Sequence, residues 1–67
     1  TLVQHEITVN AFDNFQYRLS DANGRLIEIG NGTTGMNRIN VNNKPNGLYI
    51  LQLFNNNERQ TERIIKQ

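Results

Sequence analysis

Few side chains in this sequence have the types and spacing that catalysis requires. Nucleophilic catalysis needs an activated Ser, Cys, Thr or Lys beside a general base. Ser20 is the only serine, His5 is the only histidine, and cysteine is absent. Ser20 also lacks the flanking glycines of a nucleophile elbow. We therefore expect no catalytic residues and no enzymatic activity.

The sequence offers equally little to a metal ion or a cofactor. A metal site needs several His, Cys or clustered carboxylate ligands, whereas His5 stands alone on an apolar strand face. The segment Asp21-Ala22-Asn23-Gly24 looks like the start of a calcium loop, but Gly32 stands where the acidic twelfth ligand belongs. Asp13 and Asp21 lie at predicted strand ends, where Asp accepts backbone N–H bonds in turns. We expect structural roles for both, with no metal and no cofactor.

A glycine-rich stretch, Gly30-Asn31-Gly32-Thr33-Thr34-Gly35, has the spacing G-x-G-x-x-G. In dinucleotide-binding folds this pattern follows a strand and opens a helix inside a βαβ unit. The residues that follow it, 36–41, are strand-like, and the chain is too short for such a fold. We interpret the stretch as a flexible connection between strands.

Aromatic side chains are the remaining candidates for ligand contact. Phe15 and Tyr17 share one face of a predicted strand, and Tyr49 falls in an apolar run, so packing in the core is the favoured interpretation. Phe12 and Phe54 are the better candidates for exposure.

The elements that would position these residues are strands. Apolar and polar residues alternate with period two, and no window of eleven residues shows the helical period. Residues 48–54 are apolar except at Gln52, which indicates a central strand covered on both faces. In the first strand His5 would share a face with Ile7, and in the third Ile27 would share a face with Ile29. The expected strands are residues 3–11, 15–20, 26–29, 39–41, 48–54 and 61–66.

Asparagine and glycine mark the turns between these strands. Asparagine accounts for 12 of the 67 residues; Asn-Gly occurs at residues 23–24, 31–32 and 46–47, and Asn55-Asn56-Asn57 marks a fourth turn. Asn-Gly tolerates positive φ and is the strongest short hairpin signal. Short strands at this spacing predict an all-β domain over residues 1–67. We expect a small antiparallel β-sandwich, Greek-key or immunoglobulin-like, with six to seven short strands.

Size and charge limit the classes of partner. A domain of this length buries only about 60% of its unfolded surface, so we expect support from an attached domain, a partner surface or a homodimer formed at exposed edge strands. The net charge is +1 with interleaved signs, which predicts no nucleic-acid partner. No apolar run is long enough to span a membrane. Since the sequence begins at Thr1, we expect it to be a piece of a longer protein.

Four motifs in a fixed order resemble a known family. They are Asp21-Ala22-Asn23-Gly24-Arg25 after a strand, Gly35 before the strand Ile39-Asn40-Val41, the turn Lys44-Pro45-Asn46-Gly47-Leu48-Tyr49, and the basic final strand Thr61-Glu62-Arg63-Ile64-Ile65-Lys66-Gln67. Together they resemble the C-terminal sorting domain of type IX secretion cargo proteins. Two features depart from that family. The usual Pro-Asn-Pro near the domain start is absent, and Lys44 replaces the usual apolar residue before Pro45, which should weaken the packing of that turn.

The resemblance assigns recognition to the motif residues. Physical chemistry explains part of the pattern, because Gly24 and Gly47 supply backbone freedom at tight turns and Pro45 fixes φ at the entry of its turn. The residues expected to serve recognition or to build the structural motif, called recognition residues below, are Asp21, Gly24, Arg25, Gly35, Pro45, Gly47, Tyr49, Ile64, Ile65 and Lys66.

The same resemblance implies a route and a set of partners. The domain would follow an upstream cargo domain, cross the periplasm in transit and dock on the type IX translocon at the outer membrane. A sortase-like peptidase would then remove it, leaving the cargo on the outer membrane or cell surface, or secreted. The domain would be substrate and ligand, with no catalysis of its own.

Two other classes of function remain open at this point. One is an adhesion or carbohydrate-binding β-sandwich module of a surface protein, in which exposed asparagines and Phe12 or Phe54 contact sugar. The other is a structural interaction module. A sorting domain must be the last domain of its parent, whereas a binding module need not be.

Overall fold

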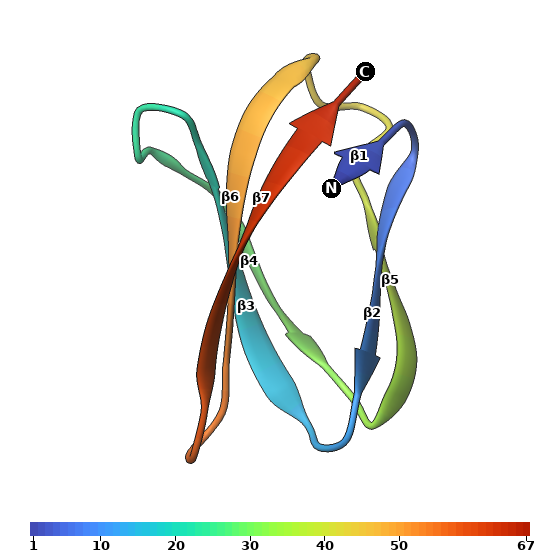
Figure 1. Cartoon of the computed structure of the whole chain (residues 1–67), viewed down its shortest axis with the longest axis vertical. Helices are drawn as coiled ribbons and strands as arrows, with labels where there is room; N and C mark the ends of the chain where they lie inside the picture. The colour runs from blue at the N-terminus through green and yellow to red at the C-terminus, as the bar shows by residue number, and fades with distance from the viewer.

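Seven β-strands form two facing sheets, and no helix is present (Figure 1). The computed structural model describes all residues from Thr1 to Gln67. The strands are β1 (Leu2–Val3), β2 (Glu6–Ala11), β3 (Phe15–Asp21), β4 (Leu26–Gly32), β5 (Gly35–Asn40), β6 (Gly47–Phe54) and β7 (Arg59–Lys66). The large sheet has the order β1-β7-β6-β3-β4, and the small sheet pairs β2 with β5. The predicted small all-β sandwich is confirmed. The structure contains no helix of the length and apolar character needed to cross a membrane.

Strand β6 lies at the centre of the large sheet and runs antiparallel to both of its neighbours, β3 and β7. This position explains its nearly continuous apolar run. The predicted turn after β6 is also present, since the Asn55 N–H donates to the Glu58 carbonyl at 3.0 Å. One edge departs from the antiparallel prediction, because β1 runs parallel to β7 with Leu2 opposite Ile65.

The core lies between the two sheets. Leu19 of β3, Leu51 of β6 and Ile64 of β7 project from the large sheet. They meet Ile7 of β2 and Ile39 of β5 from the small sheet, and all five are at most 5% exposed. Burying a side chain of this size contributes about 1.5–3 kcal/mol. Only eight hydrophobic residues are buried in the whole chain, so each of these contacts is a large part of the stability.

The prediction of one strand over residues 3–11 is wrong, because the chain changes sheets within it. Val3 belongs to β1 in the large sheet, and Glu6 begins β2 in the small one. His5 lies at the crossing and is exposed, so it does not share a half-buried face with Ile7. Its carbonyl accepts the Val41 N–H at 2.9 Å, which ties the crossing to the end of β5.

The prediction that Ile27 and Ile29 share one face of their strand is wrong. Pairing between β3 and β4 shifts register between Leu19 and Ser20, which leaves Ile27 without a direct cross-strand partner. Ile27 packs against the core, whereas Ile29 is 64% exposed on the outer face of the sheet. The bulge re-aims one side chain, which period-two alternation alone cannot anticipate.

The glycine-rich stretch is ordered strand for most of its length, and Asn31-Gly32 is not a turn. Gly30 and Gly32 belong to β4, opposite Tyr17 and Phe15 of β3. A Cβ on Gly30 would lie 2.6 Å from the Tyr17 ring, and a Cβ on Gly32 would lie inside the van der Waals envelope of the Phe15 ring. The two glycines therefore let aromatic rings lie directly on the β4 backbone.

The connection from β4 to β5 is only Thr33 and Thr34, and one side chain holds it. The Asn37 Oδ1 accepts the Thr33 N–H at 2.9 Å. Its Nδ2 donates to the carbonyls of Thr33 at 2.7 Å and Gly35 at 3.0 Å. The predicted flexible connection is thus a short, bonded crossover between the sheets.

Candidate functional site

The predicted recognition residues gather at one end of the sandwich, with one exception. We call this end the turn end: it consists of the β3–β4 turn (residues 21–25), the β5–β6 turn with the start of β6 (residues 44–49), and residues 64–66 of β7. Cross-strand pairing joins the three parts, because Tyr49 lies opposite both Asp21 and Ile64. The exception is Gly35, the first residue of β5. Figure 1 shows that β4 passes into β5 at the opposite end of the sandwich.

A shallow cleft separates the two turns and is lined by residues from both. Its volume is about 310 Å³, and its lining includes Asp21, Arg25, Ile27, Pro45, Gly47 and Tyr49. Two motifs that are about twenty residues apart in the sequence thus form the walls of one surface feature.

The first turn is built by the Asp21 carboxylate. Its Oδ1 accepts the backbone N–H groups of Asn23 and Arg25, each at 2.9 Å. The Gly24 N–H donates to the Asp21 carbonyl at 3.0 Å, and Gly24 has φ of +85°, where a side chain is strained. Asp21 therefore has the structural role predicted for it. The Arg25 Nε lies 3.4 Å from the Asp21 Oδ2, and the Arg25 side chain remains 78% exposed.

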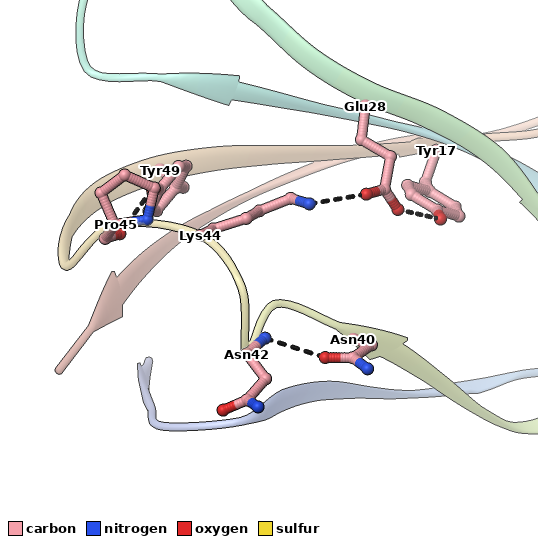
Figure 2. A network of polar contacts seen from close by, with 7 residues as sticks. All are labelled: Tyr17, Glu28, Asn40, Asn42, Lys44, Pro45 and Tyr49. Atoms are coloured by element: carbon pink, nitrogen blue, oxygen red, sulfur yellow. Dashed lines mark hydrogen bonds and ion pairs between the residues drawn. The ribbon is translucent and has the colours of Figure 1, made fainter.

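The second turn is fixed by the Tyr49 hydroxyl. Tyr49 is 6% exposed, and its hydroxyl donates to the Pro45 carbonyl at 2.6 Å (Figure 2). Gly47 has φ of +149°, so the positive φ predicted for this position is present. The Tyr49 side chain consequently serves the fold, and the turn offers its backbone and Pro45 to solvent.

The end of β7 alternates between the core and the surface. Ile64 is buried at 2%, Ile65 is 44% exposed, and Lys66 is 8% exposed. The Lys66 Nζ donates to the Asn46 Oδ1 at 3.3 Å, which ties β7 to the second turn. The Ile65 N–H donates to the Thr1 carbonyl at 2.7 Å, so β1 covers this edge. Of the three predicted recognition residues here, only Ile65 offers substantial side-chain surface.

An ion pair behind the second turn was missed by the sequence analysis. The Lys44 Nζ lies 2.8 Å from the Glu28 Oε1, and the Tyr17 hydroxyl donates to the Glu28 Oε2 at 2.7 Å (Figure 2). The Lys44 side chain is only 14% exposed. The expectation that Lys44 weakens the turn is therefore wrong, because Lys44 anchors the turn to β4. No spacing rule could have paired Lys44 with a residue sixteen positions away on another strand.

The network shifts two proton equilibria in opposite directions. The hydrogen bond from Lys44 holds the pKa of Glu28 below its usual range, although partial burial opposes this. Burial raises the pKa of Tyr17 to about 12, and the nearby Glu28 carboxylate acts in the same direction. The Glu28 carboxylate is thus held between the Lys44 side chain and the Tyr17 hydroxyl. We call this arrangement the clamp, because it joins the second turn to strands β3 and β4.

The turn end has the features of a recognition surface. No three His, Cys, Asp or Glu side chains lie close enough to hold a metal ion. No buried side-chain nitrogen or oxygen lacks a hydrogen-bond partner. The turn end presents outward the Arg25 guanidinium, the Ile65 side chain and the backbone of two hydrogen-bonded turns.

A second cleft lies at the other end, between the β2–β3 loop and the β6–β7 hairpin. Its volume is about 240 Å³, and Phe12, Phe15, Phe54, Asn10 and Asn55 are among its lining residues. Phe12 is fully exposed, as predicted, whereas Phe15 is buried at 8%. Phe54 is half-buried.

Comparison with models of known protein families gives a match over nearly the whole sandwich. A family model described as a secretion system C-terminal sorting domain matches residues 3–67, which is essentially the whole chain. No curated protein matches the chain. The matched range contains all three parts of the turn end and the second cleft.

Proposed function

The chain belongs to the family of secretion system C-terminal sorting domains, and on this premise we propose that it is the export address of a type IX cargo protein. The observation that carries the proposal is the extent of the match, residues 3–67, because the whole folded sandwich corresponds to the signal. Membership of this family implies export of the attached protein to the outer membrane, the cell surface or the medium.

The finer steps of the route belong to the same proposal. The domain crosses the periplasm attached to an upstream cargo domain and docks on the outer-membrane translocon. A sortase-like peptidase then removes it. The hydrogen-bonded turns at the turn end support docking, because a surface already ordered before binding loses little conformational entropy on association. The residue inventory agrees with a role as ligand and substrate, since the sequence has one serine, one histidine and no cysteine.

Transfer of export to an unrelated protein tests the proposal. Residues 1–67 are placed behind a fluorescent protein that carries a signal peptide for inner-membrane export, in a strain with a type IX system. We expect fluorescence outside the cell, and the mass of the exported protein reports whether the domain has been removed. Export of the intact fusion would support the address and show that residues 1–67 lack the cleavage site. Retention in the periplasm, with an additional upstream segment of the parent also included, would exclude the sorting function.

A second candidate function is carbohydrate binding, and one observation favours it. Phe12 is fully exposed beside a cleft that Asn10 and Asn55 also line, and aromatic rings with amide groups are suited to sugar contact. Under this alternative the isolated domain binds defined glycans on an array, and Phe12→Ala abolishes that binding. A sorting domain instead shows no glycan dependence, and Phe12→Ala leaves export unchanged.

A further inference from the structure

Three exposed arginines lie together on the outer face of the large sheet. Successive side chains of a strand point to opposite faces of the sheet. Leu19 of β3 points into the core, so its neighbour Arg18 points outward. Ile64 of β7 also points into the core, so Arg59 and Arg63 of that strand point outward. All three are exposed, and none has a salt bridge. We call the outer side of strands β3, β6 and β7 around these residues the arginine face.

No acidic residue lies on the arginine face. The alternation that points the three arginines outward points Glu28 and Glu62 of the same sheet inward. Asp13 and Glu58 line the cleft at the other end of the sandwich. Glu6 belongs to the small sheet.

The other exposed arginines are paired with carboxylates. The Arg25 Nε lies 3.4 Å from the Asp21 Oδ2, and the Arg38 Nε lies 3.7 Å from the Glu6 Oε1. The exposed arginines without a carboxylate partner are therefore gathered on one face. With a net charge of only +1, this is a local concentration of charge and not a general property of the chain.

The arginine face also contains two depressions that are partly lined by apolar side chains. Arg18, Arg59, Gln52 and Phe54 line a depression of about 210 Å³. A neighbouring depression of about 310 Å³ shares Arg18 and Phe54 and adds Ile29. Arginine and aromatic residues are enriched at the centres of protein interfaces, while lysine is depleted. Both lysines of this chain point away from this face, into the ion pair with Glu28 and the contact with Asn46.

We propose that the arginine face docks a folded protein surface that carries several carboxylates. Arg59 and Arg63 are four residues apart on one strand, which places their Cα atoms about 13 Å apart, and Arg18 lies two strands away from them at about 10 Å or more. At this spacing each guanidinium meets a separate anion, and it can pair bidentately with a carboxylate. Phe54 lies opposite Arg59 and lines the same depression as Arg18, so it supplies the apolar contact. The identity of the partner as a component of the export machinery rests on the proposed function.

A matched pair of double variants separates this face from general charge effects. Arg18→Gln with Arg59→Gln removes two unpaired charges, and Arg25→Gln with Arg38→Gln removes two paired ones. Each double variant lowers the net charge by two, from +1 to −1. All four side chains are exposed, so unfolding temperatures close to that of the wild type should confirm that both variants fold.

A titration followed by NMR tests the chemistry of the face directly. The probe is poly-L-glutamate at physiological ionic strength, with vesicles containing phosphatidylglycerol in parallel. We expect poly-L-glutamate to shift amide signals of β3, β6 and β7, with affinity lowered about tenfold by R18Q/R59Q and little changed by R25Q/R38Q. Equal weakening by both variants, or no shifts on this face, would overturn the proposal. Tighter binding of the vesicles than of poly-L-glutamate would also overturn it and make a lipid surface the occupant.

An export assay separates this proposal from the sorting function. Because Arg25 belongs to the turn end, the control in this assay is Arg38→Gln alone, which removes a paired arginine elsewhere. We expect export of the wild-type fusion and of R38Q, and periplasmic retention of R18Q/R59Q. Equal export of all three overturns docking by the arginine face and leaves the sorting function intact. Retention of all three, wild type included and with the additional upstream segment present, contradicts the sorting function and with it the export machinery as the partner.

Discussion

Replacing Gly32 by alanine should destabilise the domain, although the change adds one methyl group. Gly32 is buried in β4, opposite Phe15 of β3. The added Cβ would lie inside the van der Waals envelope of the Phe15 ring, closer than real Cβ contacts occur. Phe15 is itself 8% exposed, so the ring cannot swing freely into solvent.

The size of the loss follows from two opposing effects. Overpacking of this kind costs typically about 1–3 kcal/mol. The lower freedom of alanine in the unfolded chain returns about 0.4–1 kcal/mol. We expect a net loss of about 1–2 kcal/mol, against a total of about 3–10 kcal/mol for a domain of this length. In a domain this small each kcal/mol lowers the melting temperature by about 4–8 °C.

Thermal and urea unfolding, followed by circular dichroism, measure the change. The control is the same substitution in a Phe15→Leu background, where the ring that causes the clash is absent. We expect Gly32→Ala to cost clearly less free energy of unfolding there than in the wild type. An unchanged stability in the wild-type background, or an equal loss in both backgrounds, would refute the account of the glycines in β4.

Three further predictions concern the turn end and the network behind it. Gly47→Val should lower the free energy of unfolding by about 1–3 kcal/mol, because a β-branched residue is strained at φ of +149°; unchanged thermal unfolding would show that the position is unstrained. Tyr49→Phe should cost about 0.5–1.5 kcal/mol through loss of the bond to the Pro45 carbonyl, and a stability equal to that of the wild type in urea would count against that bond. The lowered pKa of Glu28 stabilises the fold above its usual pKa of 4.5, and this contribution is lost as the pH falls through the lower, folded-state value. The raised pKa of Tyr17 contributes stability that is fully present below pH 10.0 and is lost as the pH rises through about 12. The measurement is the free energy of unfolding as a function of pH. A profile that Glu28→Gln leaves unchanged at both its acidic and its alkaline end would contradict the clamp.

The sequence predicted the strands well where alternation and turn chemistry agree. Residues 48–54 were identified as the central strand because their apolar run requires cover on both faces, and β6 is that strand. The turn at Asn23-Gly24 was predicted from the tolerance of Asn-Gly for positive φ, and Gly24 has it. At Asn31-Gly32 the same dipeptide is inside a strand, because packing of the Phe15 ring requires the glycine there. The local conformational preference of Asn-Gly does not show whether the dipeptide forms a turn or lies inside a strand.

Contacts between distant parts of the chain account for the other differences. The sheet change at His5 depends on pairing of Val3 with Lys66, which no local pattern reports. The role of Lys44 depends on Glu28, which a β-bulge and a separate turn bring within reach.

The candidate site could be anticipated from motif order, but the exposure of its residues could not. Tyr49 and Ile64 support the turn end from inside, and Lys66 is buried with its ammonium on Asn46. Arg25 and Ile65 keep substantial exposed side-chain surface. Alternation shows which residues share a face, but deciding which face is covered requires the second sheet.

The most direct test of the sorting function is the fraction of a fluorescent fusion to residues 1–67 found outside the cell. The comparison is between a type IX-competent strain and the same strain without its translocon. The account predicts that most of the fusion leaves the competent strain and that it accumulates in the periplasm of the other. The same distribution in both strains would contradict it.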